Sequence, residues 1–98
     1  MLGLMLAGAL FVGNAPDMRV DAQGLHLARP GEALILAGRI RVASHDWCAV
    51  HRALLTPNSV GDPLVCEREM RRRAYNALPQ THRTDFVRAG GRTALNRP

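Results

Sequence analysis

The hydrophobic pattern of the chain begins with an uninterrupted apolar run. Residues 1–13 (MLGLMLAGALFVG) contain no charged side chain. The run has the length of the apolar core of a secretion signal and is shorter than the roughly 20 residues of a membrane-spanning helix. No Lys or Arg precedes it, and its best cleavage site, at residues 13–15, is followed by the unfavourable Pro16. We therefore interpret residues 1–15 as an apolar leader with three alternatives: an export signal or anchor, a segment buried in the fold or in an assembly, or the product of a misplaced start codon.

After the leader, the pattern changes to short apolar segments separated by turn residues. The apolar segments are residues 18–20, 25–27, 33–37 and 39–42, with turn-like clusters at 21–24 and 29–32. In the last segment Ile40 and Val42 alternate with Arg39 and Arg41, which is the period-two pattern of a strand with one solvated face. We therefore predict a small antiparallel β-meander in this part of the chain.

Two amphipathic helices are predicted to follow. The first covers about residues 45–55, because Trp47, Val50 and Leu54 recur on one helical side. The second has clearer boundaries: Asp62 suits an N-cap, Pro63 suits the first helical position, and Pro79 ends the pattern. Its acids come early and its arginines late, which is the order that the helix dipole favours. The apolar stripe of this second helix consists of Cys66, Met70, Ala74 and Ala77, with Leu78 at its edge.

The end of the chain has a weaker pattern. Residues 85–88 and 92–95 flank Gly90-Gly91, so we expect either a hairpin or a flexible arginine-bearing tail. Together with the preceding elements, this predicts one small α+β domain over residues 16–98, with a β-meander followed by two short helices packed on one face.

Positive charge is concentrated in the last third of the chain. Residues 1–62 carry five Arg and five acidic residues, whereas residues 63–98 carry eight Arg and three acidic residues, so the formal charge of +5 lies entirely in the second group. The chain contains no lysine. Such a distribution indicates that the C-terminal third contacts an anionic partner.

The arginines of the second predicted helix are the main candidates for this contact. Two of them follow an acid by one helical turn, which predicts the pairs Glu67–Arg71 and Glu69–Arg73. Arg68 and Arg72 have no acid four residues earlier. We expect an anion- or partner-binding surface that comprises Arg68, Arg71, Arg72, Tyr75 and Arg88. The alternative is a solvated helix face of the kind that amphipathic helices ordinarily present.

The two cysteines, Cys48 and Cys66, each fall near the start of a predicted helix. In an exported protein we expect them to form a disulfide, worth about 3 kcal/mol for a loop of this size, whereas in the cytoplasm they would be buried thiols. With His45 and His51 they also form an H-x2-C-x2-H…C set whose residue types suit zinc. The two histidines would point about 120° apart on one helix, so we predict neither a metal site nor a cofactor.

No motif in the sequence indicates an enzyme. Neither Ser44 nor Ser59 lies in a nucleophile elbow, and glycine motifs for phosphates or dinucleotides are missing. We therefore favour a non-enzymatic accessory or structural protein that binds a protein partner or belongs to an assembly. Its expected location is periplasmic, secreted, or membrane-associated through residues 1–13. The alternative is a small cytoplasmic or phage-type nucleic-acid-binding module, whose affinity would fall steeply with salt.

Overall fold

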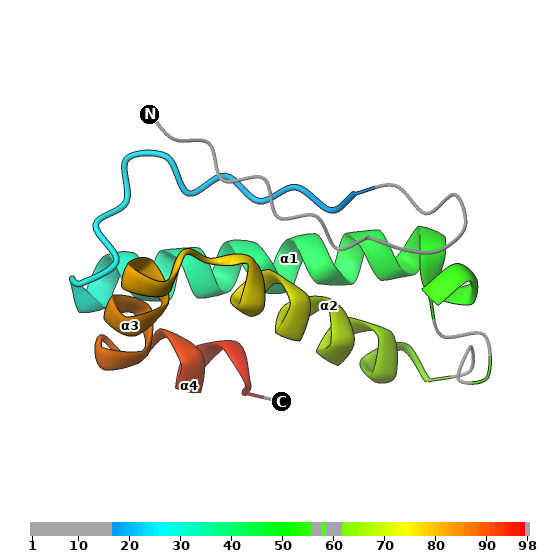
Figure 1. Ribbon diagram of the computed structural model, residues 1–98. Coiled ribbons are helices and arrows are strands. Elements are labelled where there is room, and N and C mark those ends of the chain that lie inside the picture. The colour runs from blue at the N-terminus through cyan, green and yellow to red at the C-terminus, as the bar shows by residue number, and fades with distance from the viewer. Residues whose placement is uncertain (1–16, 56–57, 59–61, 98) are drawn as a thin grey trace.

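The computed structural model describes residues 17–55, 58 and 62–97, so the predictions for the apolar leader lie outside the described residues. Within these ranges the protein is helical and contains no strand, and the predicted α+β class with its β-meander is therefore wrong (Figure 1). The helices are α1 (Pro30–Leu55), α2 (Pro63–Ala77), α3 (Gln80–Arg88) and α4 (Gly91–Leu95).

Helix α1 includes the second half of the predicted meander as well as the first predicted helix. Pro30 occupies its first position, and the carboxylate of Glu32 accepts a hydrogen bond of 2.9 Å from the backbone N–H of His26, which fixes the entry of the chain. The strand-like alternation of apolar and charged residues covers only residues 39–42. A stripe of buried side chains at helical spacing covers residues 33–48, and burial of this longer stripe favours a helix. The stripe consists of Ala33, Leu36, Ala37, Ile40, Ser44, Trp47 and Cys48.

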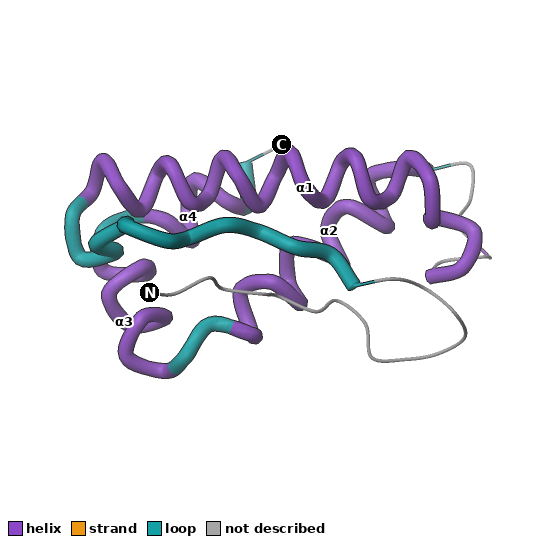
Figure 2. The backbone as a smooth tube through the Cα atoms, turned by 90° about the horizontal axis from the view of Figure 1, so that it is seen from above, coloured by secondary structure: helices purple, strands orange, loops and turns teal. Residues whose placement is uncertain are grey.

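Residues 17–22 form an extended segment that runs antiparallel to α1, and turns at residues 23–24 and 27–28 lead from it into the helix (Figures 1 and 2). Met18 and Val20 are buried in the core, and the hydroxyl of Ser44 lies 3.7 Å from the Met18 sulfur. Further along, the Arg39 guanidinium donates a hydrogen bond of 2.7 Å to the backbone carbonyl of Asp21. Side chains of a helix, rather than a β-ladder, thus hold this segment in place.

Helix α2 confirms the predicted boundaries. The side chain of Asp62 accepts a hydrogen bond of 3.0 Å from the backbone N–H of Leu64, Pro63 is the first helical residue, and the helix ends before Pro79. Helix α2 packs along α1. The buried residues of α2 are Cys66, Met70, Arg71 and Ala74.

The C-terminal region folds into two further helices, so both the hairpin and the flexible tail are wrong. Gly90 adopts a positive φ of 88° between α3 and α4, a conformation that glycine allows at low cost. Phe86 of α3 and Leu95 of α4 are fully buried, and α4 packs against both α1 and α3. Burial of these two apolar side chains explains why helices replace the tail.

Candidate anion-binding site

The clearest candidate site is a hollow of about 440 Å³ where the end of α2 meets α3 and α4. We call it the arginine pocket. None of its described lining residues carries a carboxylate, so three guanidinium groups surround the hollow without a counter-charge in its wall. The lining consists of Tyr75, Gln80, Arg83, Thr84, Val87, Arg88 and Arg92.

The ring of Tyr75 organises the arginines of the pocket. The Cζ atom of Arg92 lies 5.2 Å from the ring centroid and that of Arg83 lies 6.0 Å from it. Both distances are within the reach of a cation–π interaction. The Tyr75 ring also contacts the buried Phe86 ring at a centroid distance of 6.4 Å. The core thus positions the tyrosine, and the tyrosine positions two guanidinium groups.

The remaining polar groups of the pocket differ in how they are held. Arg83 donates a hydrogen bond of 3.2 Å to the backbone carbonyl of Asn76, which ties α3 to the end of α2. Thr84 donates one of 3.0 Å to the carbonyl of Gln80. Arg88, the last residue of α3, forms no hydrogen bond or ion pair with any described residue. Its guanidinium can therefore bind a ligand without breaking an existing contact.

The five residues predicted to form one docking surface are separated in the structure. Tyr75 and Arg88 lie in the arginine pocket. Arg68 and Arg72 lie in an adjacent hollow, which Arg92 connects to the first because it lines both. The predicted surface is thus divided into two parts that share one guanidinium group.

Arg71, the fifth predicted residue, is buried and only 8% exposed. Its guanidinium donates hydrogen bonds of 3.3 Å and 3.4 Å to the backbone carbonyls of Leu95 and Arg97. Burial lowers the pKa of the Arg71 guanidinium, and the positive charge of Arg41 lowers it further. Arg71 therefore holds the chain end that follows α4 and is not exposed for docking.

One carboxylate pairs with two other arginines of α2. Arg72 donates a hydrogen bond of 3.0 Å to Glu69, and Arg73 donates one of 2.7 Å, which confirms the predicted pairing of Glu69 with Arg73. These hydrogen bonds, with that of Arg72 foremost, lower the pKa of Glu69. Glu67 contacts His45 of α1 at 2.9 Å rather than an arginine of its own helix.

Arg83 and Arg92 were not predicted as site residues, because residues 80–98 were interpreted as a hairpin or a tail. A signal for Arg83 is nevertheless present in the sequence. Five of the pocket residues recur with helical spacing along residues 80–88, which would place them on one face of a helix. They are Gln80, Arg83, Thr84, Val87 and Arg88.

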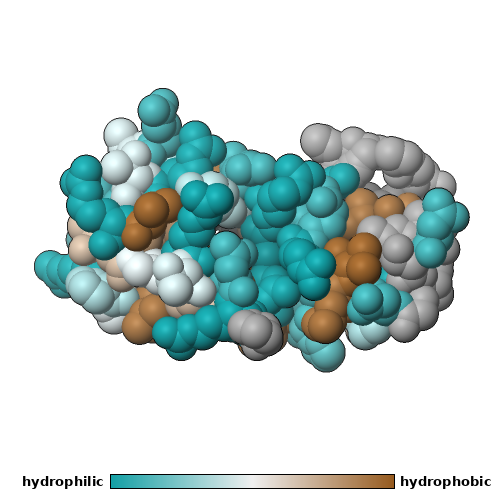
Figure 3. All heavy atoms as spheres, turned by 90° about the horizontal axis from the view of Figure 1, so that it is seen from below, coloured by the Kyte–Doolittle hydropathy of each residue, from teal (hydrophilic) through white to brown (hydrophobic). Residues whose placement is uncertain are grey.

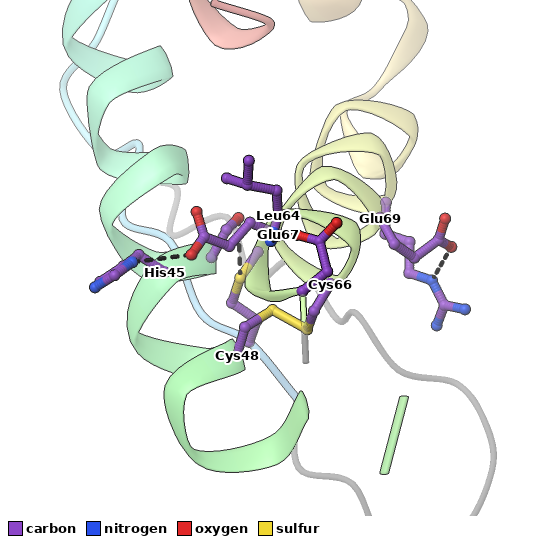
Figure 4. The surroundings of a disulfide bond; sticks show 10 residues. His45, Cys48, Leu64, Cys66, Glu67 and Glu69 are labelled. Carbon is purple, nitrogen blue, oxygen red and sulfur yellow. Dashed lines mark hydrogen bonds and ion pairs between the residues drawn. A yellow bond between two sulfur atoms is a disulfide. The ribbon is translucent and has the colours of Figure 1, made fainter. Parts of the chain in front are cut away.

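Cys48 of α1 and Cys66 of α2 lie at disulfide distance, with 2.05 Å between their sulfur atoms and 5.9 Å between their Cα atoms (Figure 4). Both are buried. The contact of His45 with Glu67 links the same two helices nearby. Cys66 lies near a helix start as predicted, whereas Cys48 lies in the second half of α1. This geometry is compatible with an oxidising, extracellular compartment.

The residues of the H-x2-C-x2-H…C set are not gathered around one point. The His51 ring packs at a tilt against the Trp47 ring at a centroid distance of 5.0 Å, and His45 contacts a carboxylate. In the described part of the chain, no three His, Cys, Asp or Glu side chains are placed to hold a metal ion.

Comparison with known proteins identified no relatives: no family model matches the chain, and neither a curated protein nor a solved structure is significantly similar to it. Among the described helices, none has the length and apolar character needed to span a membrane.

Proposed function

We propose that the protein is a non-enzymatic accessory protein that docks on an acidic segment of a protein partner through the arginine pocket. The observation that carries this proposal is the convergence of Arg83, Arg88 and Arg92 around Tyr75 in a hollow whose described wall has no carboxylate. A guanidinium group binds a carboxylate through two parallel hydrogen bonds. Arg88 and Arg92 are exposed, so each single pair would contribute only about 0.2–1 kcal/mol, and the affinity would come from several pairs formed together.

The distribution of the other arginines favours a protein ligand over a nucleic acid. A duplex presents a negative charge about every 1.7 Å along its axis, so a nucleic-acid-binding protein needs a continuous cationic track. Here Arg72 and Arg73 share the carboxylate of Glu69, which cancels one of their two charges, and Arg71 is buried. The face that α2, α3 and α4 present is hydrophilic in its centre, with apolar patches apart from one another (Figure 3). A compact pocket therefore fits a few carboxylate side chains better than a phosphate backbone.

We also propose that docking takes place in the periplasm or outside the cell. The geometry of Cys48 and Cys66 supports this location, because disulfides persist in oxidising compartments. The expected role of residues 1–15 as an export signal or anchor is consistent with it.

Binding of an acidic peptide would test the proposed docking. A fluorescein-labelled peptide of alternating Glu and Asp would be titrated with the full-length protein at low salt, and its fluorescence anisotropy measured. We expect Arg88→Gln and Arg92→Gln each to weaken binding about two- to fivefold, since an exposed ion pair contributes roughly 0.2–1 kcal/mol. Arg19→Gln, on the extended segment, is the matched control and should leave the affinity unchanged.

The same titration would be repeated with a labelled DNA duplex. Binding of the duplex but not of the peptide, with an affinity that falls steeply between low and physiological salt, would replace the proposal by the nucleic-acid alternative. Equal loss of peptide affinity in Arg88→Gln and Arg19→Gln would show that net charge, rather than the pocket, attracts the peptide.

A further inference from the structure

A second concave surface lies between α1 and the extended segment and shares no lining residue with the arginine pocket. This open groove of about 970 Å³ is lined by both elements, and most of its wall is apolar. We call it the α1 groove. Trp47 and Val20 are buried beside it, so its apolar surface continues from the core. Its volume is about twice that of the arginine pocket.

The helical side of the groove exposes a row of large apolar side chains. Ile35 is 47% exposed, Val42 is 62% exposed and Val50 is 74% exposed. Single exposed apolar residues are ordinary in soluble proteins, but these three lie on one stripe of one helix. Between them on the same stripe are two exposed charged residues, Arg39 and Asp46.

The order of residues along this stripe is self-complementary. Counted from the midpoint between residues 42 and 43, Arg39 and Asp46 lie at equal distances on opposite sides, and so do Ile35 and Val50. With a rise of 1.5 Å per residue these distances are about 5 Å and about 11 Å, and at 100° per residue all four side chains fall within about 30° of one line. A second α1 packed antiparallel across this midpoint would pair Arg39 with Asp46 of the other copy twice.

We propose that the α1 groove is the interface of a two-fold symmetric homodimer in which two α1 helices pack antiparallel. A two-fold interface requires one patch to complement itself, which this stripe does. Asp46 has no ion-pair partner among the described residues, and Arg39 donates to the Asp21 carbonyl with only one of its terminal nitrogens.

The charges of the stripe favour a second copy of the chain over residues 1–13 as the segment that covers the α1 groove. Residues 1–13 continue from the end of the extended segment at Asp17, which also lines the groove, and are themselves apolar. They contain no charged side chain, so covering the stripe with them would supply no counter-charge to Arg39 or Asp46. Burying a charge without a partner is costly, whereas a second copy supplies both partners.

Sedimentation velocity of the full-length protein over a wide range of concentrations would test the dimer. We expect the mass of a dimer at high concentration, and loss of it in Val42→Asp, which places a charge at the centre of the stripe. Leu64→Asp is the matched control: Leu64 is 51% exposed on α2 and lies outside the groove, so this variant should still dimerise. A monomer at every concentration, or equal behaviour of the two variants, would overturn the proposal.

A charge exchange would test the antiparallel register. Arg39→Asp and Asp46→Arg each place like charges opposite each other, so each should raise the dimer dissociation constant about tenfold or more. The double variant Arg39→Asp/Asp46→Arg restores complementarity and should recover the dimer. Failure of the double variant to recover would overturn this register.

Photocrosslinking would show directly which segment covers the groove. A photocrosslinker at position 50 should react with the region of Ile35 in the second copy. Products with residues 1–13 of the same chain would instead identify the leader as the occupant and overturn the proposal.

Discussion

Gly91 lies so close to the buried ring of Phe86 that a Cβ atom at position 91 would be 2.4 Å from Cε1 of the ring. We therefore expect Gly91→Ala to lower the free energy of unfolding by about 1–3 kcal/mol, because the ring or α4 must move to admit one methyl group. Urea unfolding followed by the fluorescence of Trp47, the single tryptophan, would measure the change. Gly31→Ala is the control: a Cβ atom there has no neighbour within 4 Å, and alanine favours the helix by about 0.5–1 kcal/mol. Equal changes in the two variants would contradict the packing of Phe86 on Gly91.

The pairing of Cys48 with Cys66 should be a major source of stability. It joins α1 and α2 across a separation of 18 residues, and removing it by Cys48→Ala/Cys66→Ala should cost about 3 kcal/mol. Alkylation of the denatured, unreduced protein followed by intact-mass measurement should find no free thiol. Two alkylated cysteines before reduction would contradict both the disulfide and the oxidising compartment.

Arg71 should contribute to the fold rather than to ligand binding. Its guanidinium donates to the carbonyls of Leu95 and Arg97, so Arg71→Gln should lower the free energy of unfolding by roughly 1–3 kcal/mol. The control Arg68→Gln replaces an exposed arginine of the same helix and should change stability by less than about 0.5 kcal/mol. The acidic peptide should bind Arg71→Gln as tightly as the unaltered protein wherever both are folded. Equal stability of the two variants would contradict this role.

Acid should remove the stabilisation that Glu69 provides. The hydrogen bonds from Arg72, and then from Arg73, hold the pKa of Glu69 below its ordinary value in the folded protein. A carboxylate of this kind stabilises the fold above its unfolded pKa, and the contribution is lost as the pH falls through the lower folded pKa. Because the Arg72 side chain is 60% exposed and that of Glu69 is 26% exposed, solvent screens their contact, and Glu69→Gln should cost under about 1 kcal/mol at neutral pH. Urea unfolding at several pH values should show this difference shrinking below about pH 4.5 and vanishing in stronger acid, whereas a constant difference would contradict it.

Local signals in the sequence were sufficient to predict α2. Asp62, Pro63 and Pro79 act within one or two turns of the helix ends, so their effect does not depend on the rest of the fold. The same is true of the pair formed by Glu69 and Arg73, which are neighbours on the surface of any helix.

The prediction failed where two local patterns competed. Residues 39–42 alternate like a strand, yet they belong to α1 because the longer stripe from Ala33 to Cys48 buries more apolar surface as a helix. Gly90-Gly91 likewise suited a hairpin, but Gly90 takes its positive φ between two helices, and Gly91 admits the ring of Phe86.

The sequence by itself therefore determined the charge distribution, the boundaries of α2 and the pair of cysteines available for a disulfide. The tertiary structure decided which arginines are buried and which are gathered: Arg71 was placed under the chain end, and Arg83 and Arg92 were brought to Tyr75 from separate helices. It also left the stripe around Val42 exposed on α1. The physical reason is one of range: caps, proline and charge order act over one helical turn, whereas burial and clustering depend on how helices distant in sequence pack together.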